Sequence, residues 1–136
     1  MKQPLNPEGL ATRRQVLGDA YVDRAVEGAD ALTWPLQELV TAYCWDGIWN
    51  RPGLPHTTRS LLNIAMFVAL NRPHELRIHL VGAIRNGCTP EMIQEVLLQA
   101  TAYCGFPAGI DGFKVAREVF AEMGVAVAWP AEPDAG

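Results

Sequence analysis

Charge and cysteine are both scarce in this sequence. Charged residues make up 19% of its 136 residues, whereas about 25% is usual in globular domains. Because a small domain has a large surface to cover, the shortage predicts that part of the surface is buried in an oligomer. The three cysteines, Cys44, Cys88 and Cys104, are widely spaced and form no CxxC pair. This spacing favours three half-buried thiols over a zinc site or a disulfide framework.

Long hydrophobic runs are missing as well. The densest apolar stretch, Leu61 to Leu70, contains Asn63 and is shorter than the ~20 residues of a membrane span. Residues 1–14 lack the apolar segment of a signal peptide, so we expect a cytoplasmic protein with no membrane partner. The net charge is −4, from 11 basic and 15 acidic residues. It argues against nucleic acid as a partner, because binding phosphates requires a basic face.

Several motifs of cofactor and metal chemistry are also absent. The sequence has no GxGxxG, no GxxxxGK[ST], no HExxH and no GxSxG, so no dinucleotide, phosphate, zinc or serine-hydrolase site is expected. His74 and His79 are five residues apart, which places them on different faces of a helix. The sequence therefore predicts neither a metal nor a cofactor.

What the sequence does contain is hydrophobic residues, at 49%, and repeated helix punctuation. An N-cap, a first-turn proline and an acid occur together at Asn6-Pro7-Glu8 and again at Thr89-Pro90-Glu91. No period-2 strand pattern persists. We predict an all-α fold of six to seven helices in one domain, residues 1–124, with a tail, 125–136, that is loose or packs on a neighbouring subunit. The expected helices span about 7–17, 19–24, 35–49, 55–70, 73–85, 90–104 and 108–123.

Two of these helices carry informative apolar patterns. The helix at 35–49 has a 3.6-residue stripe formed by Leu36, Leu39, Val40, Tyr43 and Cys44. The second half of the helix at 55–70 is apolar on every side. Such a helix is expected at the centre of the fold or at a subunit interface.

Polar residues gather near one turn and along the following helix. The candidates are Asp46, Arg51 and Arg59, followed by Arg72, Glu75 and His79. Glu75 and His79 are four residues apart and share a helix face. A hydrogen bond between them would fix the histidine tautomer and raise its pKa. An exposed pair that merely supports the helix is the alternative.

Three aromatic residues precede this polar cluster. Tyr43, Trp45 and Trp49 are expected in the core on pattern alone. An aromatic group beside polar residues is also how a small pocket is walled, and both interpretations stay open. The residues alone thus indicate a helical domain with one polar cluster.

Ordered sequence motifs add a resemblance. These motifs are Arg14–Val22, Trp49–Leu54 (WNRPGL), Thr58–Leu62 (TRSLL), Glu75–Ile93 (with ELRIH and NGCTPEMI) and Tyr103–Ala108 (YCGFPA). In this order they resemble the 4-carboxymuconolactone decarboxylase family, within the alkylhydroperoxidase D-like superfamily. The resemblance covers roughly residues 8 to 124.

The resemblance implies an all-α subunit in a homo-oligomer, a hexamer or a trimer. It implies cofactor-free decarboxylation of 4-carboxymuconolactone to the β-ketoadipate enol-lactone, in the protocatechuate branch of aromatic catabolism. Peroxidase relatives in the superfamily use CxxC followed four residues later by histidine. Here Arg72 and Glu75 stand at the cysteine positions before His79, so a thiol peroxidase is not expected.

The chemistry so implied assigns roles to the polar cluster. Arginines 51, 59 and 72 would bind the anionic lactone, and Tyr43, Trp45 and Trp49 would wall the pocket. His79 would stabilise the developing oxyanion. The carbon would be protonated by His79, Asp46 or Glu75.

One motif departs from the family pattern. The family often reads Trp-Gly-Glu-Val-Trp where this chain has Trp45-Asp46-Gly47-Ile48-Trp49. The acid is shifted by one position, about 100° around a helix, and is shortened to aspartate. The departure keeps two alternatives open: a paralogue that acts on a related lactone or small acid, and a non-catalytic helical oligomer.

Overall fold

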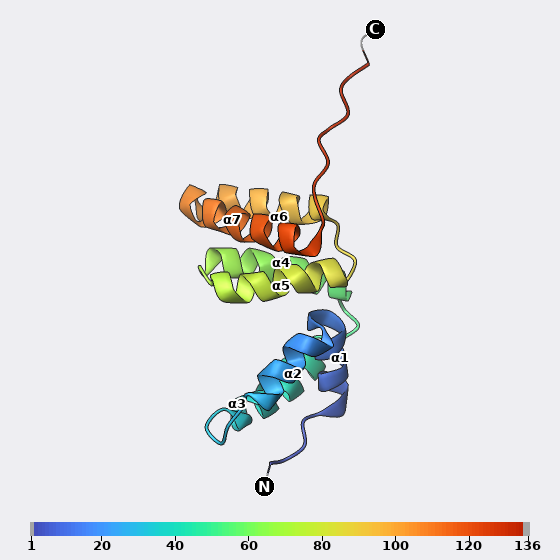
Figure 1. The fold of residues 1–136 in the computed structure, drawn as a ribbon, viewed down its shortest axis with the longest axis vertical. Coiled ribbons are helices and arrows are strands. Elements are labelled where there is room, and N and C mark those ends of the chain that lie inside the picture. Colours follow the sequence, from blue (N-terminus) through green and yellow to red (C-terminus); the bar gives the residue numbers. More distant parts are fainter. Residues whose placement is uncertain (1, 135–136) are drawn as a thin grey trace.

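The protein is helical throughout, as a computed structural model shows for residues 2–134 (Figure 1). This confirms the all-α fold class. In the described residues, seven α-helices and one π-helical segment follow one another along the chain. They are α1 (Pro7–Leu17), α2 (Asp19–Glu27), α3 (Trp34–Leu39), η1 (Val40–Asp46), α4 (His56–Ala69), α5 (Pro73–Arg85), α6 (Pro90–Cys104) and α7 (Phe106–Met123).

The predicted helix punctuation is confirmed in detail. The side chain of Asn6 accepts a hydrogen bond from the Gly9 amide at 2.8 Å, and that of Thr89 accepts one from the Met92 amide at 3.1 Å. At the other ends, Gly18 after α1 and Gly124 after α7 have positive φ angles of 90° and 68°. Glycine adopts this region without steric cost, so both helices end where the sequence indicates.

The helix expected at 35–49 is where the prediction was wrong. The chain there forms α3 and then η1. At the end of η1 the Gly47 N–H bonds to the carbonyl of Ala42, five residues earlier, at 2.9 Å. This wider turn shifts the buried face. Leu36, Leu39 and Tyr43 of the expected stripe are exposed, and Thr41 and Trp45 are buried in their place.

Two smaller boundaries also differ from the expectation. The second helix, α2, continues to Glu27 rather than ending at 24, and the last helix begins at Phe106 rather than at 108. Both differences lie at helix ends, where sequence signals are weakest.

Helices α4 to α7 form a block in two layers, with α6 and α7 lying over α4 and α5 (Figure 1). We call its interior the four-helix core. Its buried residues are Ile64, Val68, Leu76, Leu80, Ala83, Cys88, Ile93, Leu97, Ala100, Ala116 and Val119. Leu80 and Ile93 at its centre are fully buried, so this core supplies the apolar burial expected of a small helical domain.

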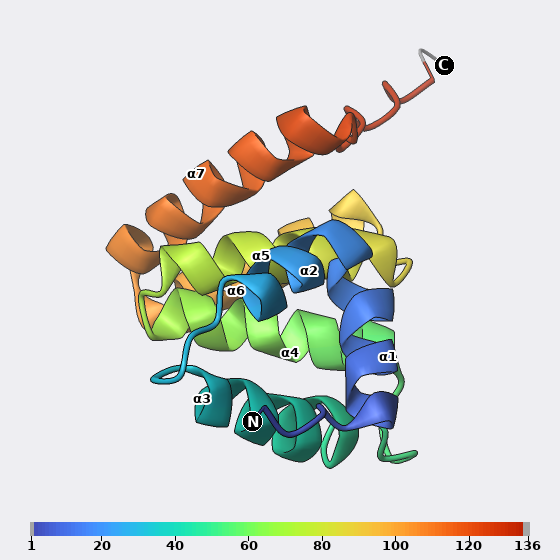
Figure 2. The same cartoon turned by 60° about the horizontal axis from the view of Figure 1, so that its bottom comes forward.

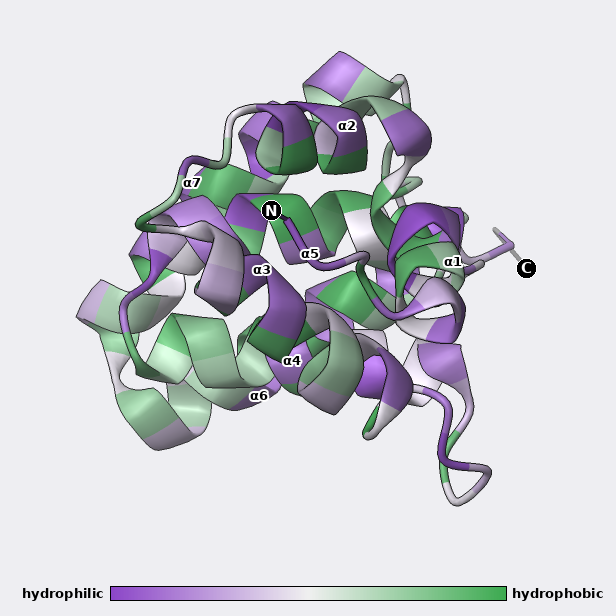
Figure 3. Ribbon diagram, turned by 90° about the horizontal axis from the view of Figure 1, so that it is seen from below, coloured by the Kyte–Doolittle hydropathy of each residue, from purple (hydrophilic) through white to green (hydrophobic). Residues whose placement is uncertain are grey.

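The remaining elements, α1 to η1, form an N-terminal lobe below this block (Figure 1). Figure 2 shows α1 crossing one end of α5, and Gly82 of α5 is packed so closely there that an added Cβ would lie 3.1 Å from Val16. In Figure 3, α2 is hydrophobic on the side facing α5 and hydrophilic on the other. We call the buried set Val16, Leu17, Val22, Trp45 and Trp49 the N-terminal cluster.

The C-terminal tail leaves the body after Gly124. Residues 125–127 line a hollow with α6 and α7, and residues 128–134 run away from the helices (Figures 1 and 2). Residues 135–136 lie outside the described part. Packing of the tail on a neighbouring subunit stays a prediction. No helix in the described residues is long and apolar enough to cross a membrane, and the cytoplasmic location likewise stays a prediction.

Candidate functional site

His79 lies on α5 at the seam between the four-helix core and the N-terminal lobe. Its ring is parallel to Trp45, with centroids 6.2 Å apart and planes 2° apart, and it is 6.5 Å from Trp49. The ring of Phe67, from α4, lies 5.1 Å from the His79 ring between centroids and is tilted by 34° to it. The imidazole is therefore held among aromatic rings from η1, the segment after it, and α4.

The two tryptophans form a rigid wall. Their rings stack with centroids 4.9 Å apart, and both side chains are buried. His56, at the start of α4, meets Trp49 edge-on at 5.5 Å, and its Nε2 lies 3.1 Å from the Trp49 carbonyl oxygen. The expectation that Trp45 and Trp49 are buried is confirmed, whereas Tyr43 is 69% exposed.

Asn63 of α4 is the polar partner of the His79 ring. Its amide Nδ2 lies 3.4 Å from His79 Nδ1. When this amide donates, Nδ1 accepts and the ring proton is carried by Nε2. Sequence reasoning missed Asn63, and the available signal was a single amide inside the otherwise apolar stretch from Leu61 to Leu70.

The charge state of His79 differs from the sequence-based expectation. Burial lowers the pKa of His79 to about 4, and the nearby Glu75 carboxylate opposes this shift without overcoming it. The expectation of a raised pKa was therefore wrong, because desolvation of the imidazolium outweighs the attraction to Glu75. At neutral pH the ring is uncharged and offers an N–H group.

Arg59 lies one turn before Asn63 on α4, so the two side chains project from the same face. Its Nη2 donates to the carbonyl oxygen of Arg51 at 3.2 Å. Among the described residues its enclosed Nε has no hydrogen-bond partner. The half-buried guanidinium places a positive charge on this face of α4, and such a charge attracts anions. The Arg51 side chain itself is exposed.

Asp46 is engaged elsewhere. Its carboxylate accepts hydrogen bonds from Asn6 at 3.3 Å and from Asn50 at 3.0 Å. Asn50 in turn accepts one from Thr12 at 2.7 Å. This network ties η1 to α1. A catalytic role for Asp46 stays a prediction.

Arg72 lies at the opposite end of α4 from Arg59. It is the residue before the first turn of α5, after α4 has ended, and it lines a small hollow with Phe67. The structure thus brings His79 together with Trp45 and Trp49, places Arg59 on the Asn63 face, and places Arg72 beyond the other end of α4. The substrate-binding roles of Arg51, Arg59, Arg72 and Tyr43 stay predictions.

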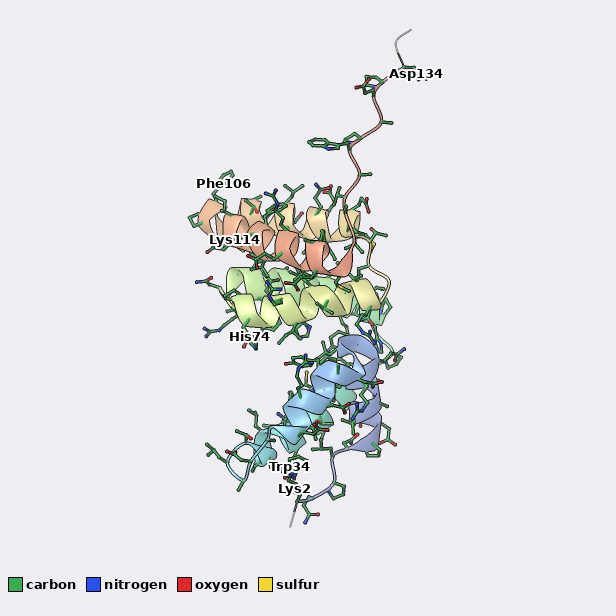
Figure 4. All side chains as sticks on the ribbon, in the orientation of Figure 1. Lys2, Trp34, His74, Phe106, Lys114 and Asp134 are labelled. Carbon is green, nitrogen blue, oxygen red and sulfur yellow. The ribbon has the colours of Figure 1, made fainter. Side chains whose placement is uncertain are left out.

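A groove of about 780 Å³ separates α2 from α5. Tyr21 of α2 and His74 and Ile78 of α5 contribute to its lining. Figure 4 shows His74 on the side of α5 that faces the N-terminal lobe. Because Ile78 precedes His79 and also packs on the N-terminal cluster, the groove runs beside the aromatic site.

Comparison with known proteins identifies the family. The model of the carboxymuconolactone decarboxylase family matches residues 35–118. The chain belongs to this family. It is 39% identical over 119 residues to a 4-carboxymuconolactone decarboxylase of Acinetobacter baylyi, covering 88% of this chain and 89% of that protein. It is 40% identical over 116 residues to the nitrosuccinic acid decarboxylase npaB of Metarhizium robertsii, covering 85% and 81%.

Within the carboxymuconolactone decarboxylase family, the shifted acid now has a structural context. A Cβ added at Gly47 would lie 2.5 Å from the Tyr43 carbonyl oxygen. The backbone fixes the positions of both this Cβ and the Tyr43 oxygen, so neither can move aside as a side chain could. A glutamate at residue 47 therefore requires the backbone after η1 to move. The family order Trp-Gly-Glu-Val-Trp is therefore incompatible with the backbone adopted here.

The three cysteines are free thiols in this family member. Cys44 is half-buried and Cys88 is buried, as expected, but Cys104 is exposed. Burial raises the pKa of Cys44 and that of Cys88. Raised pKa values disfavour the thiolate that peroxide reduction requires.

Proposed function

We propose that this protein decarboxylates a small dianion that carries its own electron sink, with 4-carboxymuconolactone as the first candidate substrate and the β-ketoadipate enol-lactone as its product. The observation that carries the proposal is the neutral His79, which offers an N–H group between Trp45 and Phe67. The relative named 4-carboxymuconolactone decarboxylase supports the choice of substrate.

The reaction needs no external electron sink. The carboxylate to be lost sits on a ring carbon conjugated through a C=C bond to the lactone carbonyl. When its C–C bond breaks, CO₂ leaves and the electron pair moves through the ring onto the carbonyl oxygen as a dienolate. A proton then adds to carbon and gives the enol-lactone. The substrate itself supplies what pyridoxal or thiamine supplies in other decarboxylases.

In this mechanism the protein stabilises charge and returns a proton. The Nε2–H group of His79 donates to the developing oxyanion, in surroundings where an N–H donor is stronger than in water. Arg59, on the Asn63 face of α4, adds positive charge that attracts the dianion to the site. The decarboxylation takes up one proton from water overall, and we assign its delivery to Glu75, which takes it from solvent and passes it to the carbon. Glu75 is chosen because it acts electrostatically on His79, whereas the Asp46 carboxylate is hydrogen-bonded to two asparagines.

Nitrosuccinate is the second candidate substrate, favoured by the relative of that name and by the displaced acid at Asp46. In this dianion the carboxylate lost is on the carbon that bears the nitro group. The electron pair released with CO₂ moves onto the nitro oxygens as a nitronate, which takes up a proton on carbon. Both candidates carry a –CH₂–COO⁻ arm on the reacting carbon, so one anion-binding arrangement serves either.

The test is CO₂ release from each substrate by the purified chain. Turnover of 4-carboxymuconolactone with a higher kcat/KM than nitrosuccinate supports the first candidate, and the reverse order supports the second. Glu75→Gln should lower kcat on the preferred substrate. No CO₂ from either, with the Acinetobacter baylyi relative active in the same assay, would remove the decarboxylase function and leave the non-catalytic oligomer.

We also propose that the protein is a homo-oligomer, a hexamer or a trimer. The support is apolar surface in the single chain: Leu62 and Met66 of α4, Leu70 just after it and Tyr103 of α6 are all exposed. Neighbouring hollows between α4 and α6 share Ala65 and Gln99, so this apolar surface is continuous. Light scattering on the purified protein tests the proposal, and a monomer at micromolar concentration would contradict it.

A further inference from the structure

Arg13 is a buried arginine with unmet hydrogen-bonding capacity. Its side chain projects from α1 into the N-terminal lobe, and the residue is only 6% exposed. Nη1 donates to Gln37 Oε1 at 2.7 Å. Among the described residues its enclosed Nε has no partner. An arginine so placed normally has its N–H groups satisfied.

Arg13 also lacks a neutralising carboxylate, unlike the exposed arginine beside it. Arg14 pairs with Asp19 at 3.3 Å and with Asp23 at 2.8 Å. No ion pair joins Arg13 to an acid anywhere in residues 2–134. Leaving a guanidinium buried without an anion is costly, and burial accordingly lowers the pKa of Arg13. The fold keeps a cation where it could have used an apolar side chain.

The ionisable groups that act on this guanidinium are Tyr21 and Cys44. Burial raises the pKa of the Cys44 thiol, so the thiol is neutral at pH 7. Both side chains pack against the N-terminal cluster, on whose Trp45 and Trp49 rings His79 stacks. Arg13 and His79 therefore border the same cluster.

The groove between α2 and α5 gives this region an opening. Tyr21, which acts electrostatically on Arg13, also lines that groove. Ile78, which precedes His79, lines it too. A small anion in the groove would therefore meet Tyr21, a neighbour of Arg13, and Ile78, a neighbour of His79.

We propose that Arg13 binds the carboxylate that the substrate keeps, the –CH₂–COO⁻ arm common to both candidate substrates. This assignment rests on the proposed function for the identity of the ligand. The retained carboxylate is the suitable partner, because a cation placed on the departing carboxylate would stabilise the ground state and slow the reaction. A carboxylate beside Arg13 supplies the missing negative charge and an acceptor for Nε.

Succinate is a direct probe, because it has the two carboxylates and the –CH₂– link but no electron sink, and so it cannot react. Calorimetry and thermal unfolding with succinate should be run on the wild type, Arg13→Met, Arg13→Lys and Arg14→Met. The wild type and R14M should bind alike. R13M should bind at least about tenfold more weakly, the loss expected when a charged hydrogen bond is removed, and succinate should no longer raise its Tm.

Thermal stability without ligand separates binding from a structural role. R13M should be at least as stable as the wild type, because replacing an uncompensated buried charge by an apolar side chain is neutral or stabilising. Should R13M fail to fold, R13K decides, because it keeps the cation but loses the planar fork and should bind several-fold more weakly. Wild-type affinity in R13M or R13K, or no binding of succinate by the wild type, would overturn the proposal. Succinate binding that requires Arg13, without CO₂ release from either substrate, would overturn only the proposed function.

Discussion

The four-helix core and the N-terminal cluster differ in what lies around them. The four-helix core is built from apolar side chains and Cys88. Around the N-terminal cluster the chain buries Thr12, Arg13 and Thr41, and it lays the His79 ring on the two tryptophans. In the described residues, two of the three enclosed polar atoms without a partner belong to Arg13 and Thr41. We infer that one region supplies stability and the other supplies chemistry.

The largest effect should come from opening a cavity in the four-helix core. Leu80 is fully buried, so Leu80→Ala should lower the free energy of unfolding by about 3 kcal/mol. The kcat of the fraction that stays folded should change little. Urea unfolding followed by circular dichroism measures the loss. Leu98→Ala, at a 48% exposed position on α6, is the control and should cost less than about 0.5 kcal/mol. Equal losses would break the comparison.

His79→Gln should show the opposite pattern. Removing the N–H donor should reduce kcat by about 10²-fold, with a much smaller effect on unfolding than Leu80→Ala has. Steady-state CO₂ release measures the change. Glu91→Gln is the control, because Glu91 is exposed on α6 away from the groove, and its kcat should equal that of the wild type. An unchanged rate in H79Q would remove His79 from the mechanism.

Acid should weaken the fold through the same residue. The pKa of His79 falls from 6.5 to about 4 on folding, so between these pH values the unfolded chain binds a proton that the folded chain does not. Stability therefore decreases as pH falls through this window. Allowing for partial exposure of the ring, the decrease is about 2 kcal/mol. Urea unfolding at pH 7 and pH 4.5 should show a smaller decrease in H79Q than in the wild type, and equal decreases would contradict the lowered pKa.

The smallest effect concerns the partner of the ring. Asn63→Leu removes the hydrogen bond to Nδ1, so both neutral tautomers become populated and kcat should fall about tenfold, the worth of one hydrogen bond. Asn86→Ala is the control. Asn86 caps the end of α5, about two turns beyond His79, and donates a hydrogen bond to Ser60 of α4 at 2.8 Å. The kcat of this variant should be unchanged. If the two variants lose activity equally, Asn63 has no special effect on His79.

The two regions also differ in how well the sequence predicted them. In the four-helix block, proline and glycine punctuation and 3.6-residue periodicity predicted α4, α5 and α6 closely, because local signals and burial agree there. In the N-terminal lobe the prediction that the apolar stripe through Tyr43 forms the buried face was wrong. A π-helical turn rotates the buried face, and such a turn has no simple sequence signature.

The site was predicted in part for the same reason. His79 and the buried Trp45 and Trp49 were found from spacing and resemblance. Asn63 and Arg13 were missed, because a hydrogen bond between two helices and the burial of one of two adjacent arginines depend on tertiary packing. The direction of the His79 pKa shift could not be read from Glu75 alone, since desolvation by the surrounding rings outweighs one neighbouring charge.

The central claim is that the aromatic site holds His79 uncharged, with its proton on Nε2. Nitrogen-15 NMR of the histidine rings, with His79 assigned through H79Q, tests it most directly across pH 5.5 to 8. We predict an unprotonated Nδ1 and a protonated Nε2 over the whole range, with no titration near 6.5. A ring that is charged at pH 6, or that carries its proton on Nδ1, would contradict the claim.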